Sequence, residues 1–533
     1  MCRAQEQYRF IPFILYQFVN CILPIRRPVV AKVHSPIYLM HRYFARRPHN
    51  LFQALISHYT KETEIILDPF LGGGVTVVEG LGLGRKVIGV DINPMAVIIT
   101  ELQVARIVLK ELIREYMRII SEVEKEISHF YKTECTCEEP QLSWVEHSEI
   151  CECPHCGKLL VLSRINKVGK GKYECPCGSV FNPNTKRRAK TIPVRVKCTC
   201  GRIRDASEED IKNFQIYEDK SNFEKELSRY ELDFPNEKIP LGKKSAEVIN
   251  KGYLKYSDLF TNRNLLAFAY IFKKIRELPA NAKNGEYPVR YALELALSSC
   301  LMEGSKLSHI KNGTVVKAGH HFWIPNISAE ANVIRLFKNR FGKILKGKEM
   351  SERIIGKRYR RAYNFSDLRY ATCLLLNKSS SSLSEIPDKS VDAIITDPPY
   401  GGNVNYLELS NFWTVWLKED FSLNSGIIDN KDETTIDFYQ NKDVKDYEKS
   451  LEYIFSECNR VLKDKRWLVL TFNNKDEKVW DALFSATERS GFYLHEDGML
   501  HQPPIKAYMT TLHQRAKGCA FGDFILSFRK KEA

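Results

Sequence analysis

Short apolar segments that end on an aspartate occur in two distant parts of this chain. The first part, EIILDPFLGGGVTVVEGLGLGRKVIGVD, predicts a strand that ends at Asp68, a glycine-rich turn, a helix and a second strand that ends at Asp91. The second part contains VDAIITD, which ends at Asp397, followed by RWLVLTF and GDFILSF. Because strands and helices alternate in both parts, we expect one α/β sheet that is interrupted by a long insertion.

The 533 residues are enough for several domains. Changes in composition predict five segments: an N-terminal extension of unspecified role (1–34), the first part of the sheet domain (35–131), a cysteine-rich insert (132–205), a mostly helical insert (206–345) and the second part of the sheet domain (346–533). The apolar run in the extension is shorter than a membrane span, and an interfacial or signal-like role is its alternative. We therefore expect no membrane association and a cytoplasmic location.

The chain is basic. It contains 80 Lys and Arg against 65 Asp and Glu, a formal charge of +15. Such an excess favours a polyanionic partner such as nucleic acid, although a merely basic soluble protein has the same composition.

Nine of the 15 cysteines lie between Cys135 and Cys200. Eight of them form four close pairs, which are Cys135 with Cys137, Cys153 with Cys156, Cys175 with Cys177, and Cys198 with Cys200. Such pairs predict two tetrahedral zinc sites in a reducing compartment, with structural roles because all ligands are sulfur. We prefer a pairing in sequence order, with the first two pairs on one zinc and the last two on the other. The alternative joins Cys153 and Cys156 to Cys175 and Cys177.

The turn after the first strand contains three consecutive glycines, Gly72 to Gly74. Glycine lets the backbone approach a ligand closely, and the following helix offers N–H donors at its N-terminus. Asp91, at the end of the next strand, is placed to accept hydrogen bonds from ribose hydroxyls, as in nucleotide-binding α/β sheets. The turn therefore predicts a cofactor site.

The strand VDAIITD is followed directly by Pro398, Pro399 and Tyr400. A strand with a proline turn is the simplest interpretation. A chemical interpretation is that Asp397 offers a carboxylate acceptor at the end of the strand, while the two prolines stiffen the acceptor surface beside it.

Phe70, Gly72 and Gly74 form the pattern FxGxG that S-adenosylmethionine-dependent methyltransferases carry. Together with the tetrapeptide that starts at Asp397, the chain resembles the amino-methyltransferases of DNA bases, in particular adenine-specific DNA methylases that contain a zinc ribbon. The stretch HRYFARRPHN, from His41 to Asn50, looks like the additional cofactor motif of that family.

The resemblance implies a Rossmann-like class I methyltransferase sheet, mostly parallel with an antiparallel strand near the edge. It implies S-adenosylmethionine as cofactor, structural zinc and DNA as partner, with RNA as the alternative. The implied cofactor-binding residues are His41, Phe44, Arg46, Asp68, Pro69, Phe70, Gly72, Gly74, Asp91 and Asn93. The implied catalytic residues are Asp397, Pro398, Pro399 and Tyr400. In the implied mechanism Asp397 accepts one hydrogen of the base amino group and the carbonyl of Pro398 accepts the other. Tyr400 would stack on a base rotated out of the duplex.

The resemblance favours methylation of adenine N6, because a tetrapeptide that begins with an acid is commoner there. Cytosine N4, RNA guanine N2, and a zinc-ribbon nucleic-acid-binding protein with a vestigial methyltransferase fold are the alternatives. Many relatives have an acid that contacts the cofactor adenine in the segment before the catalytic strand. Thr372 and Cys373 stand at the expected place here, so we expect a backbone or hydroxyl contact. A restriction or defence partner is not specified.

Overall fold

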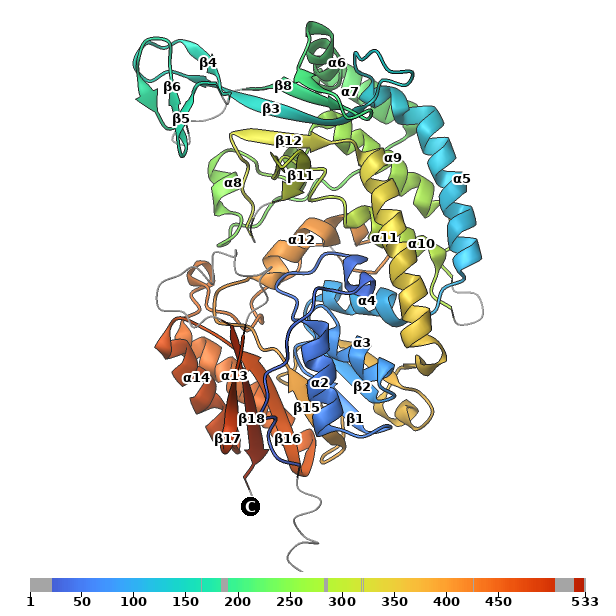
Figure 1. Ribbon diagram of the computed structural model, residues 1–533, viewed down its shortest axis with the longest axis vertical. Coiled ribbons are helices and arrows are strands. Elements are labelled where there is room, and N and C mark those ends of the chain that lie inside the picture. The colour runs from blue at the N-terminus through green and yellow to red at the C-terminus, as the bar shows by residue number, and fades with distance from the viewer. Residues whose placement is uncertain are drawn as a thin grey trace, which may run out of the picture.

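The computed structural model describes residues 22–163, 165–183, 190–281, 286–317, 319, 321–424, 426–503 and 522–531. Figure 1 shows a large sheet with its helices in the lower half and long helices with smaller sheets in the upper half. Of the predicted N-terminal extension, residues 1–21 lie outside the described residues. The backbone that follows runs in extended form beside the last strands, where Val29 N–H donates to Gln502 Oε1 at 2.8 Å.

The large sheet has the strand order β13-β14-β2-β1-β15-β16-β18-β17 within the described residues. The strands are β1 (Ile65–Asp68), β2 (Lys86–Asp91), β13 (Arg361–Ala362), β14 (Cys373–Asn377), β15 (Val391–Thr396), β16 (Leu462–Phe472), β17 (Phe492–Gln502) and β18 (Asp523–Lys530). Neighbours from β13 to β16 are parallel, and β18 is antiparallel to both β16 and β17. The expectation of a mixed α/β protein with a parallel-rich sheet is confirmed.

The two distant parts of the chain meet at the centre of this sheet, where Ile66 of β1 pairs with Ala393 of β15. Helices α2 (His49–Tyr59), α3 (Val75–Gly82) and α4 (Pro94–Val104) pack on the face that carries Ile66 and Ala393. Helices α13 (Val444–Val461) and α14 (Glu477–Arg489) pack on the face that carries Leu67 and Ile394. Covered faces on both sides explain why β15 is apolar almost throughout.

The cysteine-rich and helical segments share a second sheet in the upper half. It consists of β3 (Leu142–Glu152), β4 (Leu159–Val161), β8 (Lys190–Cys198), β9 (Ile203–Asp205) and β12 (Ile327–Ala331). Strand β12 comes from the segment expected to be mostly helical, yet it pairs with β3, Ser328 opposite His147. The small strands β5 (Lys167–Gly169), β6 (Lys172–Glu174) and β7 (Val180–Phe181) form the end that projects at upper left in Figure 1.

The helices of the upper half are α5 (Leu109–Ile127), α6 (Glu208–Glu218), α7 (Lys220–Tyr230), α8 (Ala246–Asn250), α9 (Asn262–Arg276), α10 (Val289–Ser298) and α11 (Val333–Ile354), with the hairpin β10 (Ser308–Lys311) and β11 (Thr314–Lys317). A buried ion pair joins α9 to β12, because Arg263 Nη2 lies 2.6 Å from Glu330 Oε2. His147 Nε2 of β3 contacts the same oxygen at 2.7 Å. Buried charges of this kind are tolerated because they are paired.

Helix α12 (Tyr406–Leu417) connects the two halves. It follows the proline tetrapeptide, and Trp416 stacks on Phe272 of α9 with ring centroids 5.1 Å apart. From the upper half, backbone N–H groups of Lys244 and Ser245 donate to Glu408 of α12 at 2.9 and 2.8 Å. The segment after β15 is therefore held directly by the insert.

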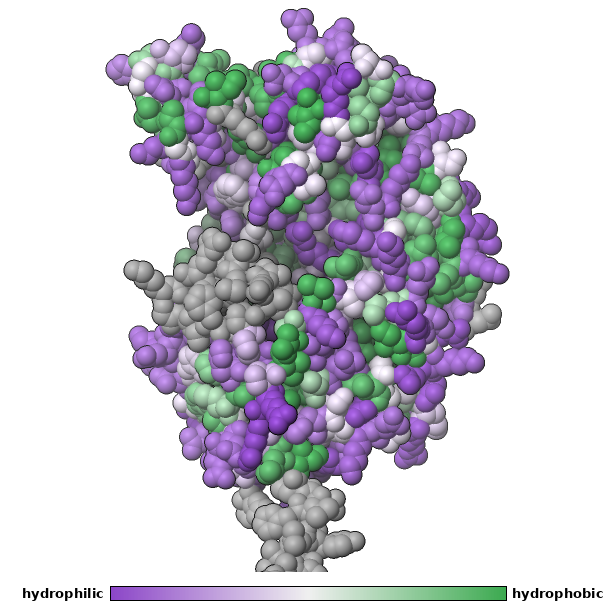
Figure 2. All heavy atoms as spheres, in the orientation of Figure 1, coloured by the Kyte–Doolittle hydropathy of each residue, from purple (hydrophilic) through white to green (hydrophobic). Residues whose placement is uncertain are grey.

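The surface is largely polar. Figure 2 shows hydrophilic side chains over most of the visible face, with hydrophobic ones on the projecting end, where Leu159, Ile165 and Val168 are exposed. Among the helices that the structure describes, none is both long enough and apolar enough to cross a membrane.

Candidate active site

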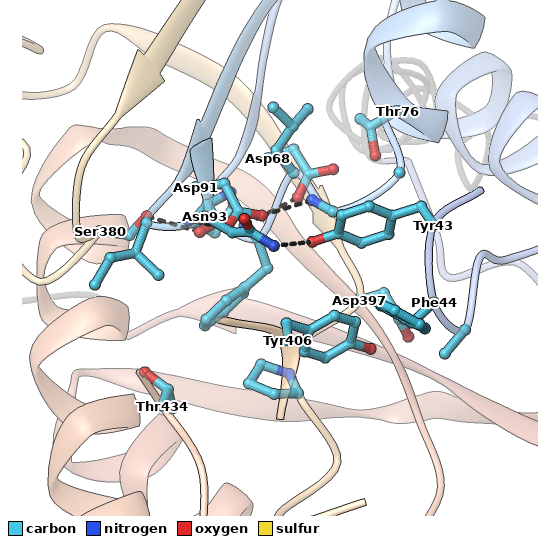
Figure 3. Close-up of a pocket in the computed structure, with 18 of the residues that line it drawn as sticks. Tyr43, Phe44, Asp68, Thr76, Asp91, Asn93, Ser380, Asp397, Tyr406 and Thr434 are labelled. Atoms are coloured by element: carbon cyan, nitrogen blue, oxygen red, sulfur yellow. Dashed lines mark hydrogen bonds between the residues drawn. The ribbon is translucent and has the colours of Figure 1, made fainter. Parts of the chain in front are cut away.

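A pocket opens where β1, β2 and β15 end (Figure 3). Asp68 ends β1, Asp91 ends β2, and Asp397 directly follows β15; all three line the pocket. It contains about 910 Å³ of empty space, part of which is open to solvent, a size that suits a small molecule or cofactor. Ligands of open parallel sheets bind at this edge.

The glycine turn is fixed in the geometry that only glycine adopts without strain. Gly72 and Gly74 have φ angles of +51° and +79°, in the left-handed region. A Cβ atom on Gly74 would lie 2.5 Å from Thr100 Oγ1 and 2.7 Å from Gln103 Oε1. Arg46 supports the turn, because its Nε donates to the carbonyl of Gly73 at 3.3 Å.

Asp91 is bound to this turn. Its Oδ2 accepts the N–H of Gly72 at 2.7 Å, and its Oδ1 accepts the N–H of Asn93 at 2.8 Å. Burial raises the pKa of Asp91 to about 6, against the effect of these two bonds. Each carboxylate oxygen can accept a further hydrogen bond, so Asp91 keeps the capacity to bind a pair of ribose hydroxyls.

Asp68 lies deeper in the same edge. Its Oδ1 accepts hydrogen bonds from Thr396 Oγ1 at 2.5 Å and from the N–H of Phe70 at 3.1 Å. Burial raises the pKa of Asp68 to about 6. Asn93 caps α4 through the N–H of Met95.

Of the residues predicted for the cofactor, those that line the pocket are Phe44, Arg46, Asp68, Pro69, Phe70, Gly72, Asp91 and Asn93. His41 and Gly74 do not line it. His41 is buried, with Nε2 3.1 Å from Ser298 Oγ and its ring edge-on to Trp413. Gly74 lies next to the pocket-lining Gly73 and is the residue that precedes α3.

We expected Thr372 and Cys373 to contact the cofactor adenine, and the structure shows that this expectation is wrong. Strand β14 runs parallel to β2, with Cys373 opposite Val87 and Asn377 opposite Asp91. Cys373 therefore begins the strand, at the edge away from the pocket. The hydroxyls of this segment that line the pocket are those of Ser379 and Ser380, after the strand end.

Asp397 is surrounded by donors. Its Oδ1 accepts from Thr471 Oγ1 at 2.6 Å and from the Tyr400 hydroxyl at 2.8 Å. Its Oδ2 accepts from Arg47 Nε at 2.7 Å. Burial raises the pKa of Asp397, whereas the charge of Arg47 and the bond from Thr471 lower it.

The remaining residues of the tetrapeptide have different surroundings. Pro399 lines the pocket, whereas Pro398 and Tyr400 do not. The ring of Tyr400 lies under Arg47, with Cζ 4.5 Å from the ring centroid, and 4.8 Å from the ring of Phe472. A stacking role for Tyr400 therefore stays a prediction.

Several pocket residues were not predicted from the sequence. The principal ones are Tyr43, Arg47, Thr76, Tyr406 and the segment from Asp432 to Thr434. Arg47 stands in the HRYFARRPHN stretch, so its position was available, but its partner Asp397 is 350 residues away. Glu433 gave no signal in the sequence; its Oε1 accepts the N–H of Tyr406 at 2.6 Å, and burial raises its pKa to about 8.

The cysteines form two groups of four, nested in the sequence. One group contains Cys135, Cys137, Cys198 and Cys200, and the other contains Cys153, Cys156, Cys175 and Cys177. The preferred pairing in sequence order is therefore wrong and the alternative is right. The reason is that β3 pairs with β8 and brings their ends together: Cys137 and Cys198 Sγ are 3.5 Å apart. Cys151 belongs to neither group.

Both groups have the geometry that a tetrahedral metal requires. In each, the sulfur atoms lie within 4.8 Å of one another, and the closest contacts are 3.5 to 3.8 Å. With Zn–S bonds of about 2.3 Å, a tetrahedron places sulfurs about 3.8 Å apart. The groups could therefore hold metal ions.

The fold and the pocket together are compatible with a methyltransferase. Comparison with known proteins agrees: residues 25–101 and 391–533 match the DNA methylase family, whose name specifies N6 and N4 methyltransferases. The matched segments supply β1, β2 and β15 to β18, and they include Asp68, Asp91 and Asp397.

Two curated proteins are similar over short stretches. The Type II methyltransferase M.HindIII of Haemophilus influenzae is 43% identical over 51 residues, 10% of this chain and 16% of that protein. The Type II methyltransferase M2.LlaDCHI of Lactococcus lactis subsp. cremoris is 46% identical over 46 residues, 9% of this chain and 17% of that protein. The chain thus spans less than a fifth of the length of each relative, and it is similar to DNA methyltransferases.

Proposed function

We propose that this chain is a DNA methyltransferase that uses S-adenosylmethionine to methylate an exocyclic base amino group, preferably adenine N6. The observation that carries the proposal is that one pocket is lined both by the glycine turn with Asp91 and by Asp397. The first set suits a nucleoside cofactor and the second suits an amino substrate. The match to the DNA methylase family over both matched segments supports it.

The pocket residues fit the proposed cofactor. Asp91 would accept the ribose hydroxyls, and Ser379 and Ser380 offer hydroxyls on the neighbouring strand end. Phe44 and Phe70 offer apolar surface in the same pocket. The cofactor supplies a methyl group on a positively charged sulfur.

Asp397 would accept one hydrogen of the substrate amino group, and the carbonyl of Pro398 would accept the other. An amino group on an aromatic ring is a weak nucleophile because its lone pair is delocalised, so holding its hydrogens as charge develops lowers the barrier. A base must leave the duplex to reach this depth. Tyr406 lines the pocket beside Asp397, and we propose that its ring, with that of Tyr400, receives the extruded base.

We propose one structural zinc ion in each cysteine group. Sites with four sulfur ligands have no open position, so they stabilise the fold rather than catalyse. We also propose that the chain is divided into the five segments given above and that the helical insert recognises DNA. We propose a cytoplasmic location for the protein. Helix α11 crosses the proposed boundary at residue 345, so the helical insert and the second part of the sheet domain share an element.

The experiment is to incubate the protein separately with duplex DNA and RNA and with methyl-labelled cofactor, then digest the nucleic acid and identify the labelled nucleoside. N6-methyladenosine from DNA supports the proposal. N4-methylcytosine from DNA corrects the base and keeps the class. Label in RNA guanine, or no label in either nucleic acid, overturns it.

A further inference from the structure

Arg47 contacts the proposed catalytic acid and two residues beside it at once. Its Nε donates to Asp397 Oδ2 at 2.7 Å, its Nη1 donates to Asp523 Oδ2 at 2.8 Å, and its guanidinium covers the ring of Tyr400. Arg47 precedes α2, whereas Asp523 begins β18, so the contacts join the two distant parts of the chain. An arginine fork between two carboxylates is more strongly oriented than a lysine could be.

The contacts around Asp397 leave a defined place for a substrate. A carboxylate offers about two acceptor positions on each oxygen. Both positions of Oδ1 are occupied, by the hydroxyls of Thr471 and Tyr400, and one position of Oδ2 is occupied by Arg47. Among the residues that the structure describes, none occupies the second position of Oδ2, which can therefore accept a hydrogen bond from a donor that enters the pocket.

We propose that Arg47 is a positioning residue for the methyl transfer, which holds the Asp397 carboxylate so that a single acceptor position faces the substrate amino group, with Asp523 holding Arg47 in place. The inference rests on the proposed function, because it takes Asp397 as the acceptor for the amino hydrogen. Arg47 itself contacts Asp397 and not the reacting atoms.

The same contact favours the charged form of Asp397, because the charge of Arg47 lowers its pKa. Burial raises the pKa of Asp397 and Arg47 lowers it, while the charge of Asp523 raises it. The other titratable groups that act on or respond to Asp397 are Asp68, Tyr400, Tyr406 and Tyr447, from β1, the tetrapeptide, α12 and α13. Without Arg47, burial and the negative charge of Asp523 would both favour the protonated form of Asp397. The protonated oxygen would no longer be an acceptor for the amino hydrogen.

The test uses the full chain, duplex DNA and S-adenosylmethionine, with Arg47→Gln, Arg47→Lys and Asp523→Asn. Arg42→Gln is the matched control, because Arg42 lies in the same segment and pairs with Glu303 at 3.0 Å. For each variant, kcat and KM are measured from pH 5 to 9, with cofactor affinity and thermal unfolding measured separately.

Arg47→Gln should lower kcat at least tenfold and move the acid limb of the kcat profile upward by about one to three pH units, the effect of losing an adjacent opposite charge. Arg47→Lys should move the acid limb of the kcat profile upward by less than Arg47→Gln does, because lysine keeps the positive charge. Asp523→Asn should also lower kcat but move the limb downward, because it removes a negative neighbour. Cofactor affinity should stay within about threefold, and Arg42→Gln should match the wild type.

An acid limb that is unchanged in Arg47→Gln, or a variant faster than the wild type, overturns the inference while leaving the proposed function intact. A wild type that does not methylate DNA overturns the proposed function instead. In that case, and where a variant has little activity, the pKa of Asp397 is read by ¹³C NMR of carboxyl-labelled protein, assigned with Asp397→Asn. That pKa should rise in Arg47→Gln and Arg47→Lys, and no rise overturns the inference.

Discussion

Replacing Asp91 by asparagine should weaken cofactor binding by a predictable amount. Asp91 accepts one backbone N–H on each oxygen, from Gly72 at 2.7 Å and Asn93 at 2.8 Å. Asparagine keeps one oxygen, so its NH₂ group must face one of these N–H donors. At least one hydrogen bond to a charged group is lost, and such a bond contributes about 1.5–3 kcal/mol. The loss weakens either the glycine turn or the contact with the ribose, and both would weaken cofactor binding.

At 1.4 kcal/mol for each factor of ten, this energy corresponds to a dissociation constant about 10 to 150 times larger. Isothermal titration with S-adenosylmethionine measures it directly. Asp392→Asn is the matched control, because Asp392 is 5% exposed and its Oδ2 accepts the N–H of Ile65 at 2.9 Å, but it stands near the start of β15, away from the pocket. If Asp91→Asn binds the cofactor as tightly as the control does, the placement of the ribose at Asp91 is refuted.

Three further predictions concern the pocket and the cysteines. Cofactor affinity should fall below about pH 6, roughly tenfold by pH 5, because burial raises the pKa of Asp91 to about 6 and only its charged form accepts both hydroxyls; pH-independent titrations from 5 to 8 would contradict this. A variant with serine at Cys135, Cys137, Cys198 and Cys200 should retain one zinc per chain by atomic absorption, whereas the pairing in sequence order predicts none. Tyr400→Phe should lower kcat about tenfold by removing the hydroxyl bond to Asp397, with KM for DNA unchanged because the aromatic ring remains; a kcat equal to that of the wild type would contradict this.

Strands β1, β2, β15, β16 and β18 were predictable because each has a strong local signal. The apolar segments around Ile66 and Ile394 are buried on both faces, so their sequence is apolar throughout and ends at a polar residue. The glycines at 72 and 74 are required by local backbone geometry, which the sequence reveals directly.

Features that depend on distant partners were not predictable. The zinc groups follow from the pairing of β3 with β8, which spacing along the chain does not encode. The position of Thr372 and Cys373 depends on where β14 begins, and a strand's start and end look alike in an apolar run. The contact of Arg47 with Asp397 depends on the closure of the sheet across 350 residues.

The central claim is that Asp397 accepts a substrate hydrogen in the pocket that holds the cofactor. It is tested most directly by single-turnover methylation of duplex DNA by wild type and Asp397→Ala, both saturated with labelled cofactor. We predict that the variant binds the cofactor within about threefold of the wild type and transfers methyl groups at least 100 times more slowly, the usual scale for losing a group that stabilises the transition state. Equal transfer rates would contradict the account.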